Sequence, residues 1–153
     1  MELLSEARMW VNKGRDKGVT CPCCDQFAKI YNRKLNTAMA RTLISVSQYF
    51  EQGGQDDYLH IEKYLARRTR ATDFYKLKFW GIIESKPLIN GTVSCGMWKV
   101  TPLGFDFVHR RCTVPKRAAI YNDELLGFSK DHTDIVESLG EYFDYSELMN
   151  AVL

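Results

Sequence analysis

The amphipathic stretch between residues 36 and 52 is the feature that most constrains the fold of this 153-residue chain. Its apolar residues recur at helical spacing on one face: Met39, Leu43, Val46 and Phe50. Asn36 or Thr37 can cap the first turn, because a short polar side chain accepts hydrogen bonds from the free backbone N–H groups there. The sequence "GGQDD" then ends the pattern. The stretch therefore predicts a helix, and the segments after it indicate the fold class.

The next segments predict a winged helix-turn-helix core over residues 36–112. Four elements follow in chain order: helices over 58–68 and 69–80, a two-stranded hairpin over 82–100, and a helix over 101–111. Turn chemistry joins the two strands through Pro87, Asn90 and Gly91. Thr101 is placed to cap the last helix, with Pro102 at its first position. Three helices, a hairpin and another helix are the order of a winged helix, so we expect an α+β fold.

The flanking segments are smaller and less regular. Residues 1–35 predict an N-terminal helix, a cysteine turn and a weak strand after Phe27. The apolar face of that helix is expected to be Leu3, Leu4, Ala7, Trp10 and Val11. Residues 113–153 predict a hairpin turning at Asn122–Asp123, followed by two short acidic helices. We expect the three segments to pack as one compact unit, with Trp10, Trp80 and Trp98 in the core.

Charge is distributed unevenly along the chain. Residues 1–119 hold 20 Lys and Arg against 11 Asp and Glu, a net charge of +9, whereas residues 120–153 hold one Lys against eight acids, a net charge of −7. A basic body favours a polyanionic partner. Alternatively, the acidic tail folds back onto the basic surface and restrains it. Charge alone leaves both interpretations open.

A basic stretch around the third predicted helix is the candidate nucleic-acid surface. In a helix-turn-helix the second helix of the motif enters the major groove by its N-terminal part, and positive side chains there contact phosphates or guanine edges. The candidate DNA-binding residues are Arg67, Arg68, Arg70, Thr72, Tyr75, Lys76, Lys86, Asn90 and Lys99. Asp73 on the same helix face weakens this interpretation. The alternatives are a solvated charged turn and a protein-interaction module.

The sequence "TCPCCDQF" places three of the five cysteines within four positions. Cys21 and Cys24 form a CxxC pair, a spacing that lets two thiolates bind one tetrahedral metal ion. His109 and Cys112 form an HxxC pair that could complete a Cys₃His zinc site with them. A cysteine-rich turn packed as small apolar side chains is the other interpretation. A redox role is disfavoured, because no βαβ pattern surrounds the CxxC.

Other functional classes receive no support from the sequence. No apolar run reaches the length of about 20 residues that a membrane helix needs, and the acidic N-terminus does not resemble a secretory signal. An odd number of bunched cysteines favours a reducing cytoplasm over a secreted disulfide framework. No phosphate-binding loop, dinucleotide-binding turn or catalytic constellation is present, so we expect a protein that is not an enzyme.

The chain also resembles a group of small proteins encoded by tailed phages and prophages. The matching stretches are "GVTCPCCDQFAKIYNRKLNTAMARTLI", "LKFWGIIE", "WKVTPLGFDFV" and "VPKRAAIYNDELLGFS" with "FDYSELM". Asp25 stands where the group usually has glycine after CPxC, which departs from a standard zinc-knuckle turn. The resemblance implies a phage protein in the host cytoplasm but no particular activity. Together with the motifs it predicts a regulatory winged-helix protein that binds duplex DNA or, alternatively, a module that targets a host protein such as a defence or transcription factor.

Overall fold

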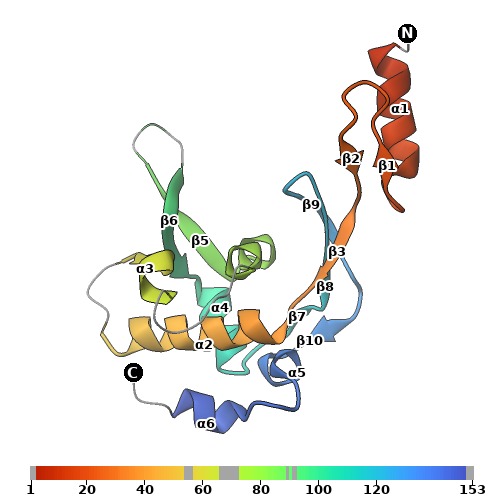
Figure 1. Ribbon diagram of the computed structural model, residues 1–153. Coiled ribbons are helices and arrows are strands. Elements are labelled where there is room, and N and C mark those ends of the chain that lie inside the picture. Colours follow the sequence, from red (N-terminus) through yellow and green to blue (C-terminus); the bar gives the residue numbers. More distant parts are fainter. Residues whose placement is uncertain (1–2, 54–56, 66–72, 89, 91–92, 151–153) are drawn as a thin grey trace. The chain divides into compact units, whose positions relative to one another are not determined.

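The computed structural model describes residues 3–53, 57–65, 73–88, 90 and 93–150. Helices and small sheets are mixed along the chain, which confirms the predicted α+β class (Figure 1). Two compact units are present: a cysteine unit, formed by residues 1–34 and 116–131, and a helical unit, formed by residues 35–115 and 132–153. The predicted segment 113–153 thus contributes to both units. Within the described ranges, no helix is both long enough and apolar enough to span a membrane.

The helical unit is the larger of the two and includes all of residues 36–112, the segment predicted as a winged-helix core. Its elements are α2 (Thr37–Glu51), β4 (Leu59–His60), α3 (Ile61–Leu65), the 3₁₀ helix η1 (Phe74–Trp80), β5 (Ile83–Pro87), β6 (Val93–Val100), α4 (Pro102–Val108), β7 (Val114–Pro115), β10 (His132–Thr133), α5 (Ile135–Leu139) and α6 (Tyr145–Met149). The main sheet has the antiparallel order β4–β6–β5, and β7 pairs with β10.

Helix α2 forms the centre of the helical unit, as its periodicity predicts. The Asn36 side chain caps it by accepting a hydrogen bond from Met39 N at 2.8 Å. Met39, Leu43 and Val46 are almost completely buried. Helices η1, α4, α5 and α6 all contact α2, so its burial supplies much of the hydrophobic stabilisation of the unit.

The predicted helix over residues 58–68 begins instead as a strand. Leu59 and His60 pair with Trp98 and Met97 of β6, and α3 starts only at Ile61. The sequence "YLHIEKYL" fits a helical period, but pairing with β6 provides backbone hydrogen bonds and buries Leu59. Tertiary context therefore overrides the local pattern at this point.

The third predicted helix is a 3₁₀ helix in the residues that the structure describes. Its buried side chains are Phe74, Leu77 and Trp80. Their spacing of three residues matches the 3₁₀ period, in which positions i and i+3 lie one above the other. Gly81 ends the helix with a positive φ of 73°, a conformation that glycine adopts without a steric cost. The indole N–H of Trp80 donates to Pro115 O at 2.7 Å, joining η1 to β7.

Four elements, η1, β5, β6 and α4, meet where β6 leads into α4. The Thr101 hydroxyl caps α4 by accepting from Gly104 N at 3.2 Å, and it also donates to the carbonyl oxygen of Gly81. A Cβ built on Gly104 would lie 2.3 Å from Ile82 O and 2.6 Å from Val100 Cγ1. The predicted hairpin and the predicted capped helix are both confirmed. The Thr-x-x-Gly sequence thus lets α4 pack directly on the backbone that enters β5.

The acidic C-terminal segment forms two short helices, as predicted, and packs on α2. Gln48 Nε2 donates to Leu148 O at 2.7 Å, and Thr37 Oγ1 donates to Leu139 O at 3.1 Å. The Arg41 guanidinium lies 4.2 Å from the ring centroid of Phe143. These contacts tie α5 and α6 to the central helix.

The cysteine unit contains a helix and two small sheets. Its elements are α1 (Leu4–Gly14), β1 (Val19–Thr20), β2 (Phe27–Ala28), β3 (Tyr31–Lys34), β8 (Arg117–Tyr121) and β9 (Glu124–Phe128). Strands β1 and β2 form a hairpin, and the other three form a sheet of order β3–β8–β9. Asn122 and Asp123 turn β8 into β9 with φ values of 49° and 61°, as the predicted hairpin requires.

The helix α1 is confirmed, but its apolar face is mostly uncovered. Ala7 is the one buried residue of α1, every residue of which is described. Trp10 is 58% exposed, so its prediction as a core residue is wrong, whereas Trp80 and Trp98 are buried as expected. The helical period of this segment predicts the helix correctly, but it does not show whether a neighbour covers the apolar face.

The contact at Gly104 predicts that replacing this glycine by alanine destabilises the helical unit. Helix propensity would favour alanine, but the new Cβ would overlap the Ile82 carbonyl and force the backbone apart. We expect Gly104→Ala to lower the free energy of unfolding by about 1–3 kcal/mol in urea denaturation. Gly127→Ala is the matched control, because no heavy atom lies within 4 Å of its added Cβ. Equal stabilities for the two variants would contradict the close approach.

Candidate functional site

The predicted DNA-binding residues belong to a basic stretch of the sequence and its surroundings. From the start of α3 to the end of β6, residues 61–100 hold eight Lys and Arg against three Asp and Glu, a net charge of +5. The predicted ligands Arg67, Arg68, Arg70 and Thr72 lie outside the described residues. The other predicted ligands lie on η1 and on or beside the hairpin.

The two predicted DNA ligands on η1, Tyr75 and Lys76, both contact other side chains of the protein. The half-buried Tyr75 packs its ring against Trp98, with centroids 5.5 Å apart. Lys76 Nζ lies 2.8 Å from Asp73 Oδ1, and Asp73 Oδ2 also accepts from Asn36 Nδ2 at 3.3 Å. The structure thus pairs Asp73 with Lys76, a predicted phosphate ligand. A carboxylate in this position competes with a DNA phosphate for the lysine.

The two lysines of the hairpin share an aromatic neighbour. The Nζ atoms of Lys99 and Lys86 lie 5.0 Å and 6.0 Å from the ring centroid of Tyr58. Lys99 Nζ also lies 3.0 Å from Glu84 Oε1. The hydrogen bond to Glu84 raises the pKa of Lys99, so this side chain stays positive at neutral pH. Asn90 is exposed next to the hairpin turn.

Tyr58 is a residue of this site that sequence reasoning missed. Its position at the start of the predicted helix over 58–68 gave it no role beside the hairpin. Because Leu59 pairs with Trp98 of β6, Tyr58, the residue before Leu59, lies next to the hairpin lysines. The only available signal was strand propensity in "YLH", which is too short to distinguish from a helix start.

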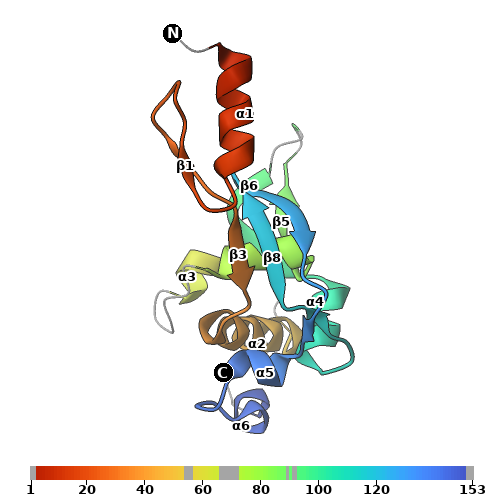
Figure 2. The same cartoon turned by 90° about the vertical axis from the view of Figure 1, so that its right-hand side faces the viewer.

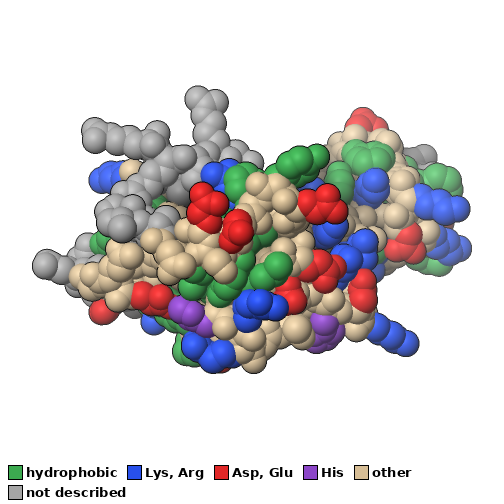
Figure 3. Space-filling model, turned by 90° about the horizontal axis from the view of Figure 1, so that it is seen from below, with side chains coloured by type: hydrophobic (Ala, Val, Ile, Leu, Met, Phe, Trp, Pro, Cys, Tyr) green, Lys and Arg blue, Asp and Glu red, His purple; other side chains and the backbone are tan. Residues whose placement is uncertain are grey.

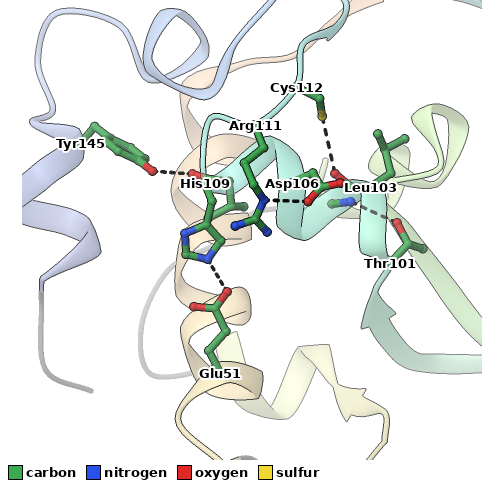
Figure 4. A network of polar contacts seen from close by, with 10 residues as sticks. Glu51, Thr101, Leu103, Asp106, His109, Arg111, Cys112 and Tyr145 are labelled. Atoms are coloured by element: carbon green, nitrogen blue, oxygen red, sulfur yellow. Dashed lines mark hydrogen bonds and ion pairs between the residues drawn. The ribbon is translucent and has the colours of Figure 1, made fainter.

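A second polar cluster lies where α2, α4 and α6 meet (Figure 4). His109 Nε2 pairs with Glu51 Oε1, and Arg111 Nε donates to Asp106 Oδ1 at 2.8 Å. The Tyr145 hydroxyl donates to Val108 O at 2.6 Å, and burial raises the pKa of that phenol. These contacts link the end of α4 to the central helix and to the C-terminal helix.

Two predicted metal ligands belong to this cluster. His109 is paired with Glu51, and the Cys112 thiol donates to Leu103 O at 3.9 Å. Burial raises the pKa of Cys112 above the ordinary value of a thiol. Both side chains therefore have partners within the helical unit.

The cysteine turn joins β1 to β2 in the cysteine unit. Cys21 N donates to Gln26 O at 2.8 Å, and Asp25 N donates to Cys21 O at 2.9 Å. Asp25 has a φ of 60°, the left-handed region that glycine adopts most readily. The backbone N–H groups of Cys24 and Cys23, together with the Cys24 thiol, hydrogen-bond to Cys21 and lower its pKa.

The predicted Cys₃His site is split between the two units. Cys21 and Cys24 belong to the cysteine unit, whereas His109 and Cys112 belong to the helical unit. Among the described residues, no group of three or more His, Cys, Asp and Glu side chains is arranged to hold a metal ion. Zinc binding by all four residues therefore stays a prediction.

The opposite pKa shifts of two cysteines predict different rates of alkylation. In the metal-free, reduced protein near pH 8, Cys21 has the lower pKa and therefore the larger thiolate fraction, and Cys112 the smaller. Because the thiolate is the nucleophile, we expect iodoacetamide to modify Cys21 several-fold faster than Cys112. Peptide mass spectrometry over a pH series measures both rates, with urea-unfolded protein as the control in which the rates converge. Faster modification of Cys112 in the folded protein would contradict the order of the two pKa values.

Comparison of this chain with protein-family models, curated proteins and solved structures finds no match in any of the three. The resemblance to phage proteins therefore stays a prediction. Two candidate sites bear on function, namely the basic surface around η1 with its hairpin and the cysteine turn.

Proposed function

We propose that the helical unit is a winged helix-turn-helix that binds duplex DNA in a regulatory, non-enzymatic role. The observation that carries the proposal is the net charge of +5 on residues 61–100, a stretch that forms a short helix, η1 and a hairpin in succession. In this assignment η1 is the recognition helix and the β5–β6 hairpin is the wing.

The order of elements supports the winged-helix assignment. Helix α2, α3 and η1 precede the β5–β6 hairpin, and α4 follows it. Strand β4 pairs with β6, which anchors the hairpin to the segment between α2 and α3. A hairpin fixed in this way is a rigid support for side chains that contact a DNA backbone.

The ion pairs on this surface are compatible with phosphate binding. Lys76 and Lys99 pair with Asp73 and Glu84, but these side chains are between 32% and 51% exposed. An exposed pair contributes only about 0–1 kcal/mol, so a DNA phosphate can replace either carboxylate at small cost. Lys86 and Lys78 are exposed as well. The described lysines thus supply phosphate contacts, and the arginines at 67, 68 and 70 extend the basic sequence towards the N-terminus of η1.

The position of the acidic C-terminal helices, α5 and α6, favours a DNA surface that they leave uncovered. Within the helical unit, α5 and α6 lie on the side of α2 opposite to η1 and the hairpin (Figures 1 and 2). Asp134 and Asp144 are used as N-caps of α5 and α6. On the face seen from below, acidic and basic side chains are interspersed (Figure 3). The position of these two helices favours a structural role for them over masking of the proposed DNA surface.

A protein partner is the second candidate function, and a different observation favours it. Leu3, Leu4, Met9, Trp10 and Phe27 are each at least 58% exposed in the cysteine unit. Exposed large apolar side chains in one small unit are typical of protein contacts. A host protein bound there is compatible with DNA binding by the helical unit.

The DNA proposal predicts that binding weakens as salt increases, and that the arginines at 67, 68 and 70 account for much of this salt dependence. Each phosphate contact adds about 0.9 to the slope of log K against log salt. Replacing Arg67, Arg68 and Arg70 together by alanine should therefore flatten that slope by about 2–3. Fluorescence anisotropy with mixed-sequence duplex DNA over a salt series measures it.

The matched control removes the same charge from the other unit. Replacing Arg8, Lys13 and Lys17 by alanine also removes three positive charges and should leave the slope nearly unchanged. Equal effects of the two triple variants would indicate general attraction rather than a site. If the wild-type protein fails to bind DNA even at low salt, the DNA proposal is wrong and the protein-partner function is preferred.

A further inference from the structure

The cysteine turn carries two thiols at CxxC spacing, Cys21 and Cys24. Cys21 and Cys24 stand three positions apart in a turn that ends at Asp25, a spacing that lets two thiolates bind one tetrahedral ion. The two backbone hydrogen bonds from Cys21 N and Asp25 N hold the turn closed. Cys24 is exposed and Cys21 is half-buried. A metal ion can therefore reach the turn from solvent.

The cysteine unit cannot complete this site alone. A structural zinc ion takes four ligands, almost always from Cys and His. The sequence of the unit, residues 1–34 and 116–131, contains no histidine and no cysteine beyond Cys21, Cys23 and Cys24. In the helical unit, His109 pairs with Glu51 and the Cys112 thiol donates to Leu103 O. An identical CxxC pair from a second copy provides the two missing thiolates without breaking either contact.

The surface around the turn fits a second copy as well. Helix α1 lies beside the β1–β2 hairpin that carries the turn (Figures 1 and 2). Leu3, Leu4 and Trp10, which share one face at the start of the chain and along α1, expose large apolar side chains, and so does Phe27 on β2. A two-fold axis through the metal would place the same patch of each copy at one self-complementary interface. Burial of these side chains would then stabilise the pair.

We propose that Cys21 and Cys24 from two copies of the chain together bind one zinc ion in a tetrahedral Cys₄ site, and that the exposed apolar side chains of α1 and β2 pack around it. The proposal does not depend on DNA binding by the helical unit, and it makes a second copy, in place of a host protein, the occupant of these apolar side chains. A two-fold dimer would nevertheless present two helical units to a DNA site with two half-sites.

The decisive measurement is zinc content together with molar mass. In reducing buffer with zinc present, we expect half a zinc ion per chain, by elemental analysis, and a dimer by light scattering. Removal of zinc with a chelator should give monomers, and added zinc should restore dimers. This reversibility keeps the test valid if a cysteine variant folds poorly.

Variants of the same turn provide the matched comparison. Cys24→Ser should lose both zinc and dimer, whereas Cys23→Ser should keep both, because the central positions of a CxxC turn do not share the metal. His109→Ala and Cys112→Ser should also keep both. Trp10→Lys should raise the concentration needed for zinc-dependent dimerisation at least ten-fold, because it puts a charge into the apolar contact.

Three results would overturn the proposal. One zinc ion per monomer that is lost in His109→Ala would indicate the site within a single chain. A dimer that persists after zinc removal would indicate a purely apolar contact. Absence of zinc after purification without chelator and after direct zinc titration would indicate a packed turn. DNA binding is measured separately, so its failure leaves this test unaffected.

Discussion

The close approach of Gly104 to the Ile82 carbonyl is the contact on which the helical unit depends most directly. At this point the end of η1, the start of β5, the end of β6 and the start of α4 meet, and the Thr101 hydroxyl hydrogen-bonds across the junction. The missing side chain lets α4 pack on backbone rather than on a neighbouring side chain. The direction of the hairpin relative to η1 is thereby fixed, and with it the spacing of the lysines in the proposed DNA surface.

Helix α2 plays a complementary part, because it is packed from two directions. The helices η1 and α4 contact it, and α5 and α6 contact it by way of Thr37, Arg41 and Gln48. The acidic C-terminal segment is therefore integral to the fold as well as a source of negative charge. Its carboxylates at 134 and 144 stabilise their own helix N-termini, where negative charge is favourable.

Sequence patterns correctly predicted the elements that are specified by nearby residues. They failed where contacts with distant segments determine the secondary structure or the burial of a residue. The period of Met39, Leu43 and Val46, the Thr101 cap and the Asn122–Asp123 turn each specify their structure within a few residues, and each element is present. Leu59 becomes a strand residue because it pairs with Trp98, which lies too far along the chain for any local window to include. Likewise, the period of α1 identifies its apolar face but not whether a neighbour covers Trp10. For the sites, charge and cysteine spacing selected the candidates, but the pairing of Lys99 with Glu84 and of His109 with Glu51 joins segments that only the fold brings together.

The two units differ in how they can be stable. The helical unit buries most of the apolar core around α2, whereas the cysteine unit has 34 residues from one segment and 16 from another, and all four residues of β3 are exposed. A unit of this size seldom has a core worth more than about 3–5 kcal/mol, and small domains usually compensate with metals, disulfides or association. A pair of thiols at the end of a hairpin and an apolar helix face left exposed are the two features from which such compensation is built. A metal shared between two copies would use both at once, because the thiolates would bind the ion while the apolar faces of α1 bury one another around it.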